Sequence, residues 1–162
     1  MKKFLYLLAF TMLLLGSCAK ETVYIDPAAD QSFSLGGTSW NLVAATSYFY
    51  FGQEKFDMDL YALMPTCAKD DLMIFNKDNT IIGSYGSLRC GNESTAYPDF
   101  GTWKLSSDKK TLEISSRAFN VVGTDMLKCE VLALNENNLQ IRYETTANGL
   151  TSTTTSSYKR IK

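Results

Sequence analysis

Residues 127–144, LKCEVLALNENNLQIRYE, carry the pattern that decides the fold. Apolar and polar side chains alternate from residue 139 to residue 144, which predicts a strand with one buried and one exposed face. The stretch before it alternates in the same way, and its apolar members are Leu127, Cys129, Val131 and Ala133. Residues 135–138, NENN, predict the turn of an antiparallel hairpin, and Leu134 interrupts the alternation, which predicts a bulge there.

Short segments of the same kind recur elsewhere in the chain, separated by turn residues. They span residues 39–45, 72–75, 81–85, 102–105, 111–115, 117–122 and 152–161. About eight to ten strands at such close spacing are typical of an all-β sandwich or barrel. In the turn 76–79, NKDN, we expect Asn79 to adopt a left-handed backbone conformation.

One segment departs from the β pattern. Residues 57–64 begin with Asp57, carry apolar residues at positions 60, 61, 63 and 64, and are followed by Pro65. An acidic cap, helical spacing and a terminating proline predict one short helix. Just before it, the run YFYF at 48–51 places aromatic rings on both faces of any strand, which is more than a half-exposed strand needs.

The first 18 residues indicate export and lipidation. Lys2 and Lys3 precede a twelve-residue apolar run, 4–15, that is too short to cross a bilayer of about 30 Å as a helix. Residues 15–18, LGSC, resemble the lipobox of bacterial lipoproteins, in which the cysteine is acylated and becomes the new N-terminus. Ordinary secretory cleavage beside an incidental cysteine is the alternative. The resemblance implies a membrane anchor through Cys18, because two or more acyl chains hold a protein stably at a membrane.

On this basis the chain divides into a signal peptide, 1–17, a lipid-anchored tether, 18–36, and a folded domain, 37–162. The tether lacks a sustained period and carries Pro27. Ala19 follows Cys18. An Asp at that position would resemble the inner-membrane retention mark of Gram-negative lipoproteins, and this chain does not carry one there. We therefore expect the protein in the outer membrane of a Gram-negative cell envelope. The sequence leaves open which face of that membrane carries it.

Composition narrows the classes of function. The 162 residues include no histidine, which excludes Ser-His-Asp and Cys-His catalysis and every His-ligated metal site. Removing residues 1–17 removes two lysines and leaves 14 basic against 17 acidic residues, and the resulting net charge of −3 argues against nucleic acid. A calcium site is disfavoured, because residues 76–80 lack the glycine and distal glutamate of a calcium loop. The acidic residues are therefore interpreted as cap and turn residues. We expect no enzyme activity, no cofactor and no metal.

Several weak motifs follow one another in a fixed order. They are Trp40-Asn41-Leu42, CAKDDL at 67–72, Phe75, DNT at 78–80, Cys90, GTWKL at 101–105, Leu112-Glu113-Ile114, Leu134 and Leu139-Gln140-Ile141. Their order resembles the lipocalin-like domain of small Gram-negative lipoproteins. The resemblance implies a small antiparallel up-and-down β-barrel of about eight strands, which can hold one small apolar ligand, and it implies no reaction. This sequence departs from the family at Asn79, where glycine is frequent, and in the aromatic-rich insert 46–63.

The resemblance also implies a disulfide between Cys67 and Cys90, which flank the hairpin around residues 76–79. Three cysteines remain once Cys18 is acylated, and the compartment beyond the inner membrane is oxidising. Cys129 lies on the apolar face of its strand, so we expect a buried, unreactive thiol. A Cys129 nucleophile is the alternative, which the lack of histidine disfavours. By analogy with lipocalins, we expect Arg160 to stack on Trp40 and close one end of the barrel.

Two hypotheses about function follow. In the first, the anchored barrel binds a small hydrophobic ligand in an apolar cavity of about 300 Å³ or more. The candidate lining residues are Phe49, Phe51, Tyr85, Trp103, Phe119 and Tyr143. In the second, the barrel is filled by its own side chains and the aromatic region 48–51 docks a protein partner, which predicts an exposed apolar patch of several hundred Å². The sequence does not identify the ligand or the partner.

Overall fold

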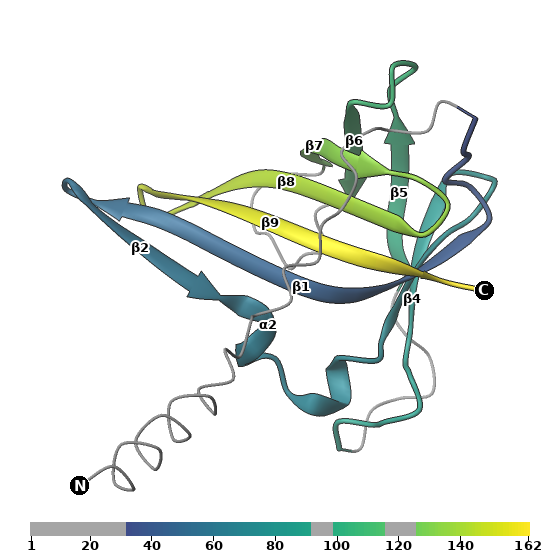
Figure 1. Cartoon of the computed structure of the whole chain (residues 1–162), viewed down its shortest axis with the longest axis horizontal. Coiled ribbons are helices and arrows are strands. Elements are labelled where there is room, and N and C mark those ends of the chain that lie inside the picture. Colours follow the sequence, from purple (N-terminus) through teal and green to yellow (C-terminus); the bar gives the residue numbers. More distant parts are fainter. Residues whose placement is uncertain (1–31, 92–98, 116–125) are drawn as a thin grey trace, which may run out of the picture.

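The computed structural model describes residues 32–91, 99–115 and 126–162, which form one antiparallel sheet of nine strands (Figure 1). The strands are β1 (Thr38–Phe51), β2 (Glu54–Asp59), β3 (Leu72–Phe75), β4 (Thr80–Ser84), β5 (Asp99–Leu105), β6 (Thr111–Ser115), β7 (Met126–Leu134), β8 (Asn138–Ala147) and β9 (Leu150–Ile161). Their order in the sheet is β2-β1-β3-β4-β5-β6-β7-β8-β9, and β1 also pairs with β9. That pairing closes eight strands into a barrel and leaves β2 outside it. The predicted all-β barrel of about eight strands is therefore confirmed.

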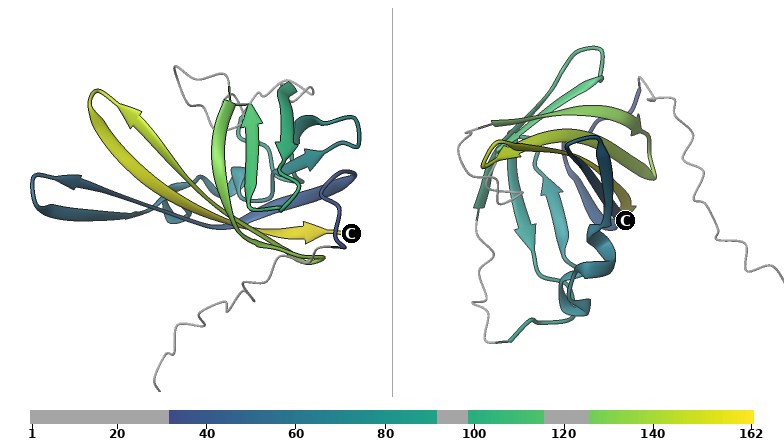
Figure 2. Two further views of the ribbon diagram at one scale, coloured as in Figure 1. Left: turned by 90° about the horizontal axis from the view of Figure 1, so that it is seen from above. Right: turned by 90° about the vertical axis from the view of Figure 1, so that its left-hand side faces the viewer.

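The longest strand, β1, connects the barrel to the extra strand. Its first residues, 38–41, pair with β3, whereas residues 46–51 pair with β2 on the same side. Its other side pairs with β9 along most of its length, with a register shift between Leu42 and Ala44. As a result, the β1–β2 and β8–β9 hairpins extend beyond the shorter strands, and their tips lie apart (Figure 2).

Turn chemistry fixes the hairpins. Asn79 in the β3–β4 turn has a φ of 67°, which confirms the predicted left-handed conformation. The β8–β9 turn is Asn148-Gly149, with φ values of 52° and 77°, as a type I′ turn requires. Gly52, with a φ of 64°, begins the two-residue turn between β1 and β2. The predicted turn at 135–138 is confirmed by the hydrogen bond that Asn135 N donates to Asn138 O, at 3.0 Å.

The core fills the end of the barrel at which the described chain enters, which we call the base. Its fully buried large residues are Leu35, Trp40, Phe75, Ile81, Leu112, Ile114, Leu134, Leu139 and Ile141. Leu35 is 1% exposed, so the packed structure begins inside the segment that the sequence predicts as a tether. Close packing here comes from alternate residues of strands on all sides of the barrel.

Arg160 contributes to the base, but not as the resemblance implies. Its guanidinium lies 5.3 Å from the centre of the Phe33 ring, and Phe33 in turn packs edge-on against Trp40, with the ring centres 6.2 Å apart. Arg160 and Trp40 are neighbours across the β1–β9 pairing. The expected stacking on Trp40 is therefore replaced by stacking on Phe33, because residues upstream of β1 fold back under the barrel.

The helix prediction is wrong for half of its length. Residues 57–59 belong to β2, and α2 covers only Leu60–Leu63. The N-cap is Asp59, whose Oδ1 accepts a hydrogen bond from Ala62 N at 2.9 Å, instead of Asp57. Pairing with β1 gives residues 54–59 backbone hydrogen bonds that a short helix would have to replace. In the part of the chain that the structure describes, no helix is long and apolar enough to cross a membrane.

Three further predictions concern the remaining strands and the disulfide. The bulge in β7 lies between Val131 and Ala133, upstream of the predicted position, and it brings both Ala133 and Leu134 into the core. The predicted strand 117–122 lies outside the described residues. The Cys67–Cys90 disulfide is confirmed, and it connects the short 3-10 helix η2 (Thr66–Ala68) to the loop after β4.

Candidate functional site

The interior of the barrel changes character along β1, β8 and β9. At the base it is apolar, as described above. Farther from the base, the same strands direct hydroxyl groups inward, from Ser47, Tyr143, Thr154 and Ser156, and we call these four residues the hydroxyl cluster. Ser47, Thr154 and Ser156 are buried. A small apolar molecule would therefore meet packed side chains at the base and polar groups above it.

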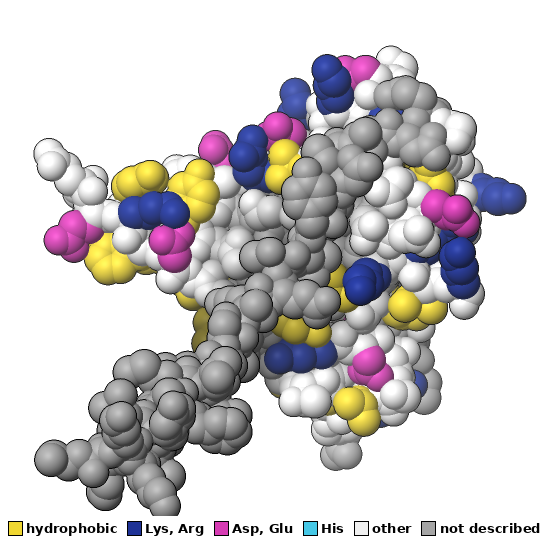
Figure 3. All heavy atoms as spheres, in the orientation of Figure 1, with side chains coloured by type: hydrophobic (Ala, Val, Ile, Leu, Met, Phe, Trp, Pro, Cys, Tyr) yellow, Lys and Arg dark blue, Asp and Glu magenta, His cyan; other side chains and the backbone are white. Residues whose placement is uncertain are grey.

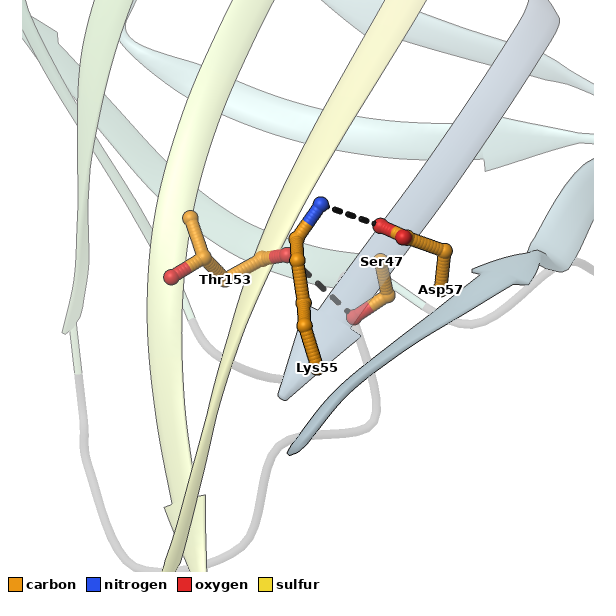
Figure 4. A network of polar contacts seen from close by, with 4 residues as sticks. All are labelled: Ser47, Lys55, Asp57 and Thr153. Carbon is orange, nitrogen blue, oxygen red and sulfur yellow. Dashed lines mark hydrogen bonds and ion pairs between the residues drawn. The ribbon is translucent and has the colours of Figure 1, made fainter. Parts of the chain in front are cut away.

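The hydroxyl cluster satisfies its own hydrogen bonds. Ser47 Oγ donates to the Thr153 carbonyl oxygen at 3.3 Å (Figure 4). Thr154 Oγ1 donates to Ser47 Oγ at 3.1 Å, so side chains reinforce the β1–β9 pairing. Tyr143 hydrogen-bonds the side chains of Ser156 and Thr154. Buried polar groups that pair with one another contribute to structure. Among the described residues, these hydrogen bonds join the hydroxyls to other hydroxyls and to a backbone carbonyl, none of which is a base that would make them nucleophiles.

Burial keeps the titratable groups of this region neutral. Desolvation raises the pKa of the Cys129 thiol to about 12, and Cys129 is fully buried, as its place in the alternation predicts. Desolvation also raises the pKa of Tyr143, although hydrogen bonds with Ser156 and Thr154 oppose that shift, and it raises the pKa of Tyr158. A thiol with a raised pKa is a poor nucleophile, which disfavours the Cys129 alternative.

Beyond the hydroxyl cluster, the two faces of the β1–β2 hairpin differ sharply. We call residues 46–59 the arm. Because side chains alternate along each strand, the apolar face carries Phe49, Phe51, Phe56 and Met58, and the polar face carries Tyr48, Tyr50, Lys55 and Asp57. Phe49 and Phe56 are paired across the strands and stacked, with ring centres 5.3 Å apart and an angle of 12° between planes.

The apolar face of the arm lies largely in solvent. Phe51 is 74% exposed, Phe56 42% and Met58 39%. Leu150, at the tip of the β8–β9 hairpin, is 38% exposed. Figure 3 shows hydrophobic side chains along the projecting part of the molecule, on either side of charged ones. Contiguous exposed apolar side chains of this kind mark interaction surfaces in soluble domains.

The polar face of the arm is ordered by one lysine. Lys55 Nζ lies 2.6 Å from Asp57 Oδ1, and the two side chains are drawn in Figure 4. The same ammonium group lies 4.6 Å from the centre of the Tyr48 ring, which packs edge-on against Tyr50. The hydrogen bond to Asp57 raises the pKa of Lys55, so the lysine is charged at physiological pH.

The structure does not bring the six candidate lining residues together. Phe49 and Phe51 lie on the arm, Tyr143 belongs to the hydroxyl cluster, and Phe119 lies outside the described residues. Trp103 is at the base, where its ring packs edge-on against Phe75 at 5.5 Å and its Nε1 donates to Asn76 O at 3.2 Å. Tyr85 follows β4, and the Arg89 guanidinium lies 4.5 Å from its ring centre.

Two hollows in the described surface are open and partly charged. One, of about 850 Å³, is bordered by β1, β6, β7, β8 and β9, and its lining includes Lys128, Glu130, Arg142 and Glu144. Arg142 forms an ion pair with Glu130 at 2.6 Å within it. The other, of about 600 Å³, lies at the base, and its lining includes Lys104 and Lys109. Neither has the enclosed apolar character that the ligand hypothesis predicts.

Comparison with known proteins does not name a family. No protein-family model matches the chain, and no curated protein matches it. The resemblance to lipocalin-like lipoproteins therefore stays a prediction, whereas the barrel itself is a property of the structure.

Sequence reasoning missed two residues of the arm's apolar face, Phe56 and Met58. Their signal was the alternation of residues 55–60, KFDMDL, in which charged and apolar residues take turns. That alternation has the period of a strand, and the glycine at position 52 marks the turn before it. The candidate site is therefore the whole arm, of which residues 48–51 are one strand.

Proposed function

We propose that this protein is a non-enzymatic, lipocalin-like lipoprotein, anchored at the outer membrane through acylated Cys18, whose β1–β2 arm docks a protein partner. The single observation that carries the docking role is the exposed apolar face of the arm, with Phe51 at 74% exposure. The anchor rests on the sequence LGSC at 15–18. The role of a binding scaffold fits a barrel whose base is filled by its own side chains.

Docking by the arm accounts for features that ligand binding inside the barrel leaves unexplained. An apolar residue in solvent contributes nothing to folding, whereas burying it against a partner contributes about 1.5–3 kcal/mol. Phe51 sits at the end of β1, beyond the last residue that pairs with β9, so its side chain adds nothing to barrel closure. Aromatic side chains on a rigid strand are also well suited to binding, because they lose little entropy when they are buried.

The test is photo-crosslinking of the full chain in cells that express and export it. A photoreactive phenylalanine analogue replaces Phe51. In a matched control it replaces Lys159, an exposed residue of β9 that pairs with Asn41 near the base of the barrel. We expect a discrete protein adduct from position 51 and none from position 159. The absence of an adduct from position 51, or equal adducts from both positions, would overturn the docking role.

The anchor has its own test. Cells expressing the full chain are labelled with radioactive palmitate, alongside cells expressing Cys18→Ala. We expect label in the unaltered protein and none in the variant, because the thiol of Cys18 is the acylation site in this proposal. Unlabelled protein would contradict the anchor. The docking role would still be judged by the crosslinking result alone.

A small hydrophobic ligand is the second candidate function. The observation that favours it is that the apolar face of the arm continues the inward face of β1, through Ala45, Ser47 and Phe49. A flat apolar molecule stacked on Phe49 and Phe56 would lie above the hydroxyl cluster. Native mass spectrometry of the full chain, purified from membranes, distinguishes the two. A retained small molecule that is lost in Phe56→Ser would favour this function over protein docking.

A further inference from the structure

β2 forms one edge of the sheet. It stands at the end of the strand order beside β1, and no other strand in the described ranges pairs with it. All six of its residues, Glu54–Asp59, are exposed. An edge strand presents a row of unpaired backbone N–H and C=O groups along its free side, and these groups can pair with another strand. Figure 1 shows β2 on the outside of the arm.

Charged side chains usually protect such an edge, and on β2 their effect depends on register. Lys55 and Asp57 share the polar face, and Phe56 lies between them on the apolar face. Suppose that β2 pairs antiparallel with the β2 of a second copy and that the apolar face continues from one copy to the other. Each residue must then face one from its own side of the sheet, so every allowed register is centred on a residue. The registers centred on Phe56 and Asp57 overlap most, and those centred on Lys55 and Met58 overlap less.

Of these four registers, only the one centred on Phe56 avoids placing like charges opposite each other. Centring on Lys55 places two lysines opposite each other, and centring on Met58 places Asp57 opposite Asp59 twice. Centring on Asp57 pairs Lys55 with Asp59 twice but places the two Asp57 side chains opposite each other, which is destabilising. Centring on Phe56 places Lys55 of each copy opposite Asp57 of the other. The two Phe56 rings then face each other, and Glu54 faces Met58. The charge pattern of β2 therefore selects one self-pairing register and disfavours its neighbours.

We propose that the partner of the arm is a second copy of this chain, joined edge to edge through β2 about a two-fold axis at Phe56. This inference rests on the proposed function, because it names the partner that the arm docks. The contact is isologous, as most homodimer contacts are. In the single chain, Lys55 and Asp57 of β2 pair with each other at 2.6 Å on the exposed surface. In the dimer, each would pair with its counterpart from the other copy, so opposite charges are paired in both states.

The size of the contact fits a membrane-bound protein. Two six-residue strands bury less surface than the roughly 1,600 Å² of a standard stable interface, so the dimer is weak in dilute solution. Anchoring both copies to one membrane raises their effective concentration and compensates for a weak contact. The contact also joins the two apolar faces, each with Phe49, Phe51, Phe56 and Met58, into one surface.

Cysteine crosslinking in membranes tests the register. The full chain carries Phe56→Cys, and the matched control carries Met58→Cys, which lies on the same face with nearly the same exposure, 39% against 42%. Facing residues of an antiparallel pair lie within about 5.5 Å, inside the reach of a disulfide. Residues 58 of the two copies would be separated by four residues along the strand, about 13 Å, which is beyond that reach. We expect a disulfide-linked dimer of Phe56→Cys only. Equal crosslinking of both variants, or none, overturns the proposal.

Charge complementation tests the pairing without new cysteines. Two differently tagged full-length copies are co-expressed and one is purified from the membrane extract through its tag. We expect Lys55→Asp in both copies, or Asp57→Lys in both, to reduce co-purification roughly tenfold or more, because like charges then face each other twice. A Lys55→Asp copy with an Asp57→Lys copy restores two opposite-charge pairs and should recover the contact. Lys159→Asp in both copies is the control and should change nothing.

The outcomes separate this inference from the proposed function. If the photo-crosslink at position 51 has the mass of two copies and the charge variants complement, the second copy is the partner. If the adduct has another mass and the variants do not complement, the inference fails while arm docking stands. If position 51 yields no adduct and the copies do not co-purify, both fail.

Discussion

The base of the barrel and the β1–β2 arm are built from the same kinds of residue and differ in what surrounds them. At the base, Trp40 and Phe75 are fully buried among strands from every side of the barrel. On the arm, Phe51 and Phe56 come from strands of the same sheet, and solvent covers much of their surface. Burial determines whether an aromatic side chain stabilises the fold or remains available for binding.

The difference arises in one strand. Residues 38–41 of β1 have neighbours on both sides within the closed barrel, β3 and β9. Residues 46–51 exchange β3 for β2, which has no further neighbour in the described ranges and so leaves the sheet open. A closed sheet has no edges, whereas an open end has one that another strand can use. Base and arm thus place a closed part and an open part of the sheet within one 14-residue strand.

The largest expected effect is at the base. Trp40→Ala removes a fully buried ring that packs against Phe33 and lies within the base. We expect it to lower the free energy of unfolding by about 3–5 kcal/mol, because the lost burial and the remaining cavity add. Urea titration followed by far-UV circular dichroism measures it. A loss below about 1 kcal/mol would show that the base is not the source of stability.

The disulfide gives the next largest effect. Cys67 and Cys90 close a loop with a sequence separation of 23. We expect the paired change Cys67→Ala and Cys90→Ala to lower the free energy of unfolding by about 3.5 kcal/mol, through the greater chain entropy of the unfolded state. The measurement is the urea midpoint with and without reductant. Reductant should lower the midpoint of the unaltered protein and leave that of the paired variant unchanged.

The base follows from the sequence because local signals agree there. Around residues 127–144, alternation, turn residues and apolar positions all indicate one hairpin, and apart from Leu134, which the bulge turns inward, the core residues lie where the alternation places them. Asn79 shows the same agreement, since a turn that needs positive φ carries a residue that tolerates it. Each of these signals is local, so no knowledge of distant partners is needed.

The arm does not follow from the sequence, and the reasons are specific. Before the register shift between Leu42 and Ala44, even-numbered residues of β1 such as Trp40 face inward, and after it odd-numbered ones such as Ala45 face inward. Counting every second residue from Trp40 therefore gives the wrong face for Phe49 and Phe51. β2 exists as a strand because β1 continues far enough to pair with it, which is a long-range condition. A bulge and a distant pairing are both hard to infer from a single sequence.

A smaller effect concerns pH, and it belongs to the barrel side of the comparison. Burial raises the pKa of Cys129 from 9.0 to about 12 and also raises that of Tyr143. Unfolded protein loses these protons at lower pH than folded protein, so stability is complete below about pH 9 and falls as pH rises toward 12. We expect a loss of about 1.4 kcal/mol per pH unit from Cys129 in that window.

Urea midpoints of the unaltered protein and of Cys129→Ala, measured from about pH 8 to about pH 10.5, test this pH dependence. The variant should lose stability with a shallower slope, because it has one titrating group fewer. Parallel slopes would mean that the thiol is not protected by burial. The comparison uses slopes, since removing the sulfur lowers stability at every pH by creating a small cavity.

The smallest effect on stability, and the one that bears most on function, is expected on the arm. Phe51→Ala removes a ring that is 74% exposed, so we expect the free energy of unfolding to stay within about 0.5 kcal/mol of its original value. Urea titration measures it beside Trp40→Ala, which changes an aromatic residue on the same strand. A loss above about 1 kcal/mol would mean that the ring is packed within the folded chain, and the arm would then resemble the base. An unchanged stability combined with weaker co-purification of two tagged copies would instead assign the ring to recognition, because only an interaction made outside the fold can be lost without cost to the fold.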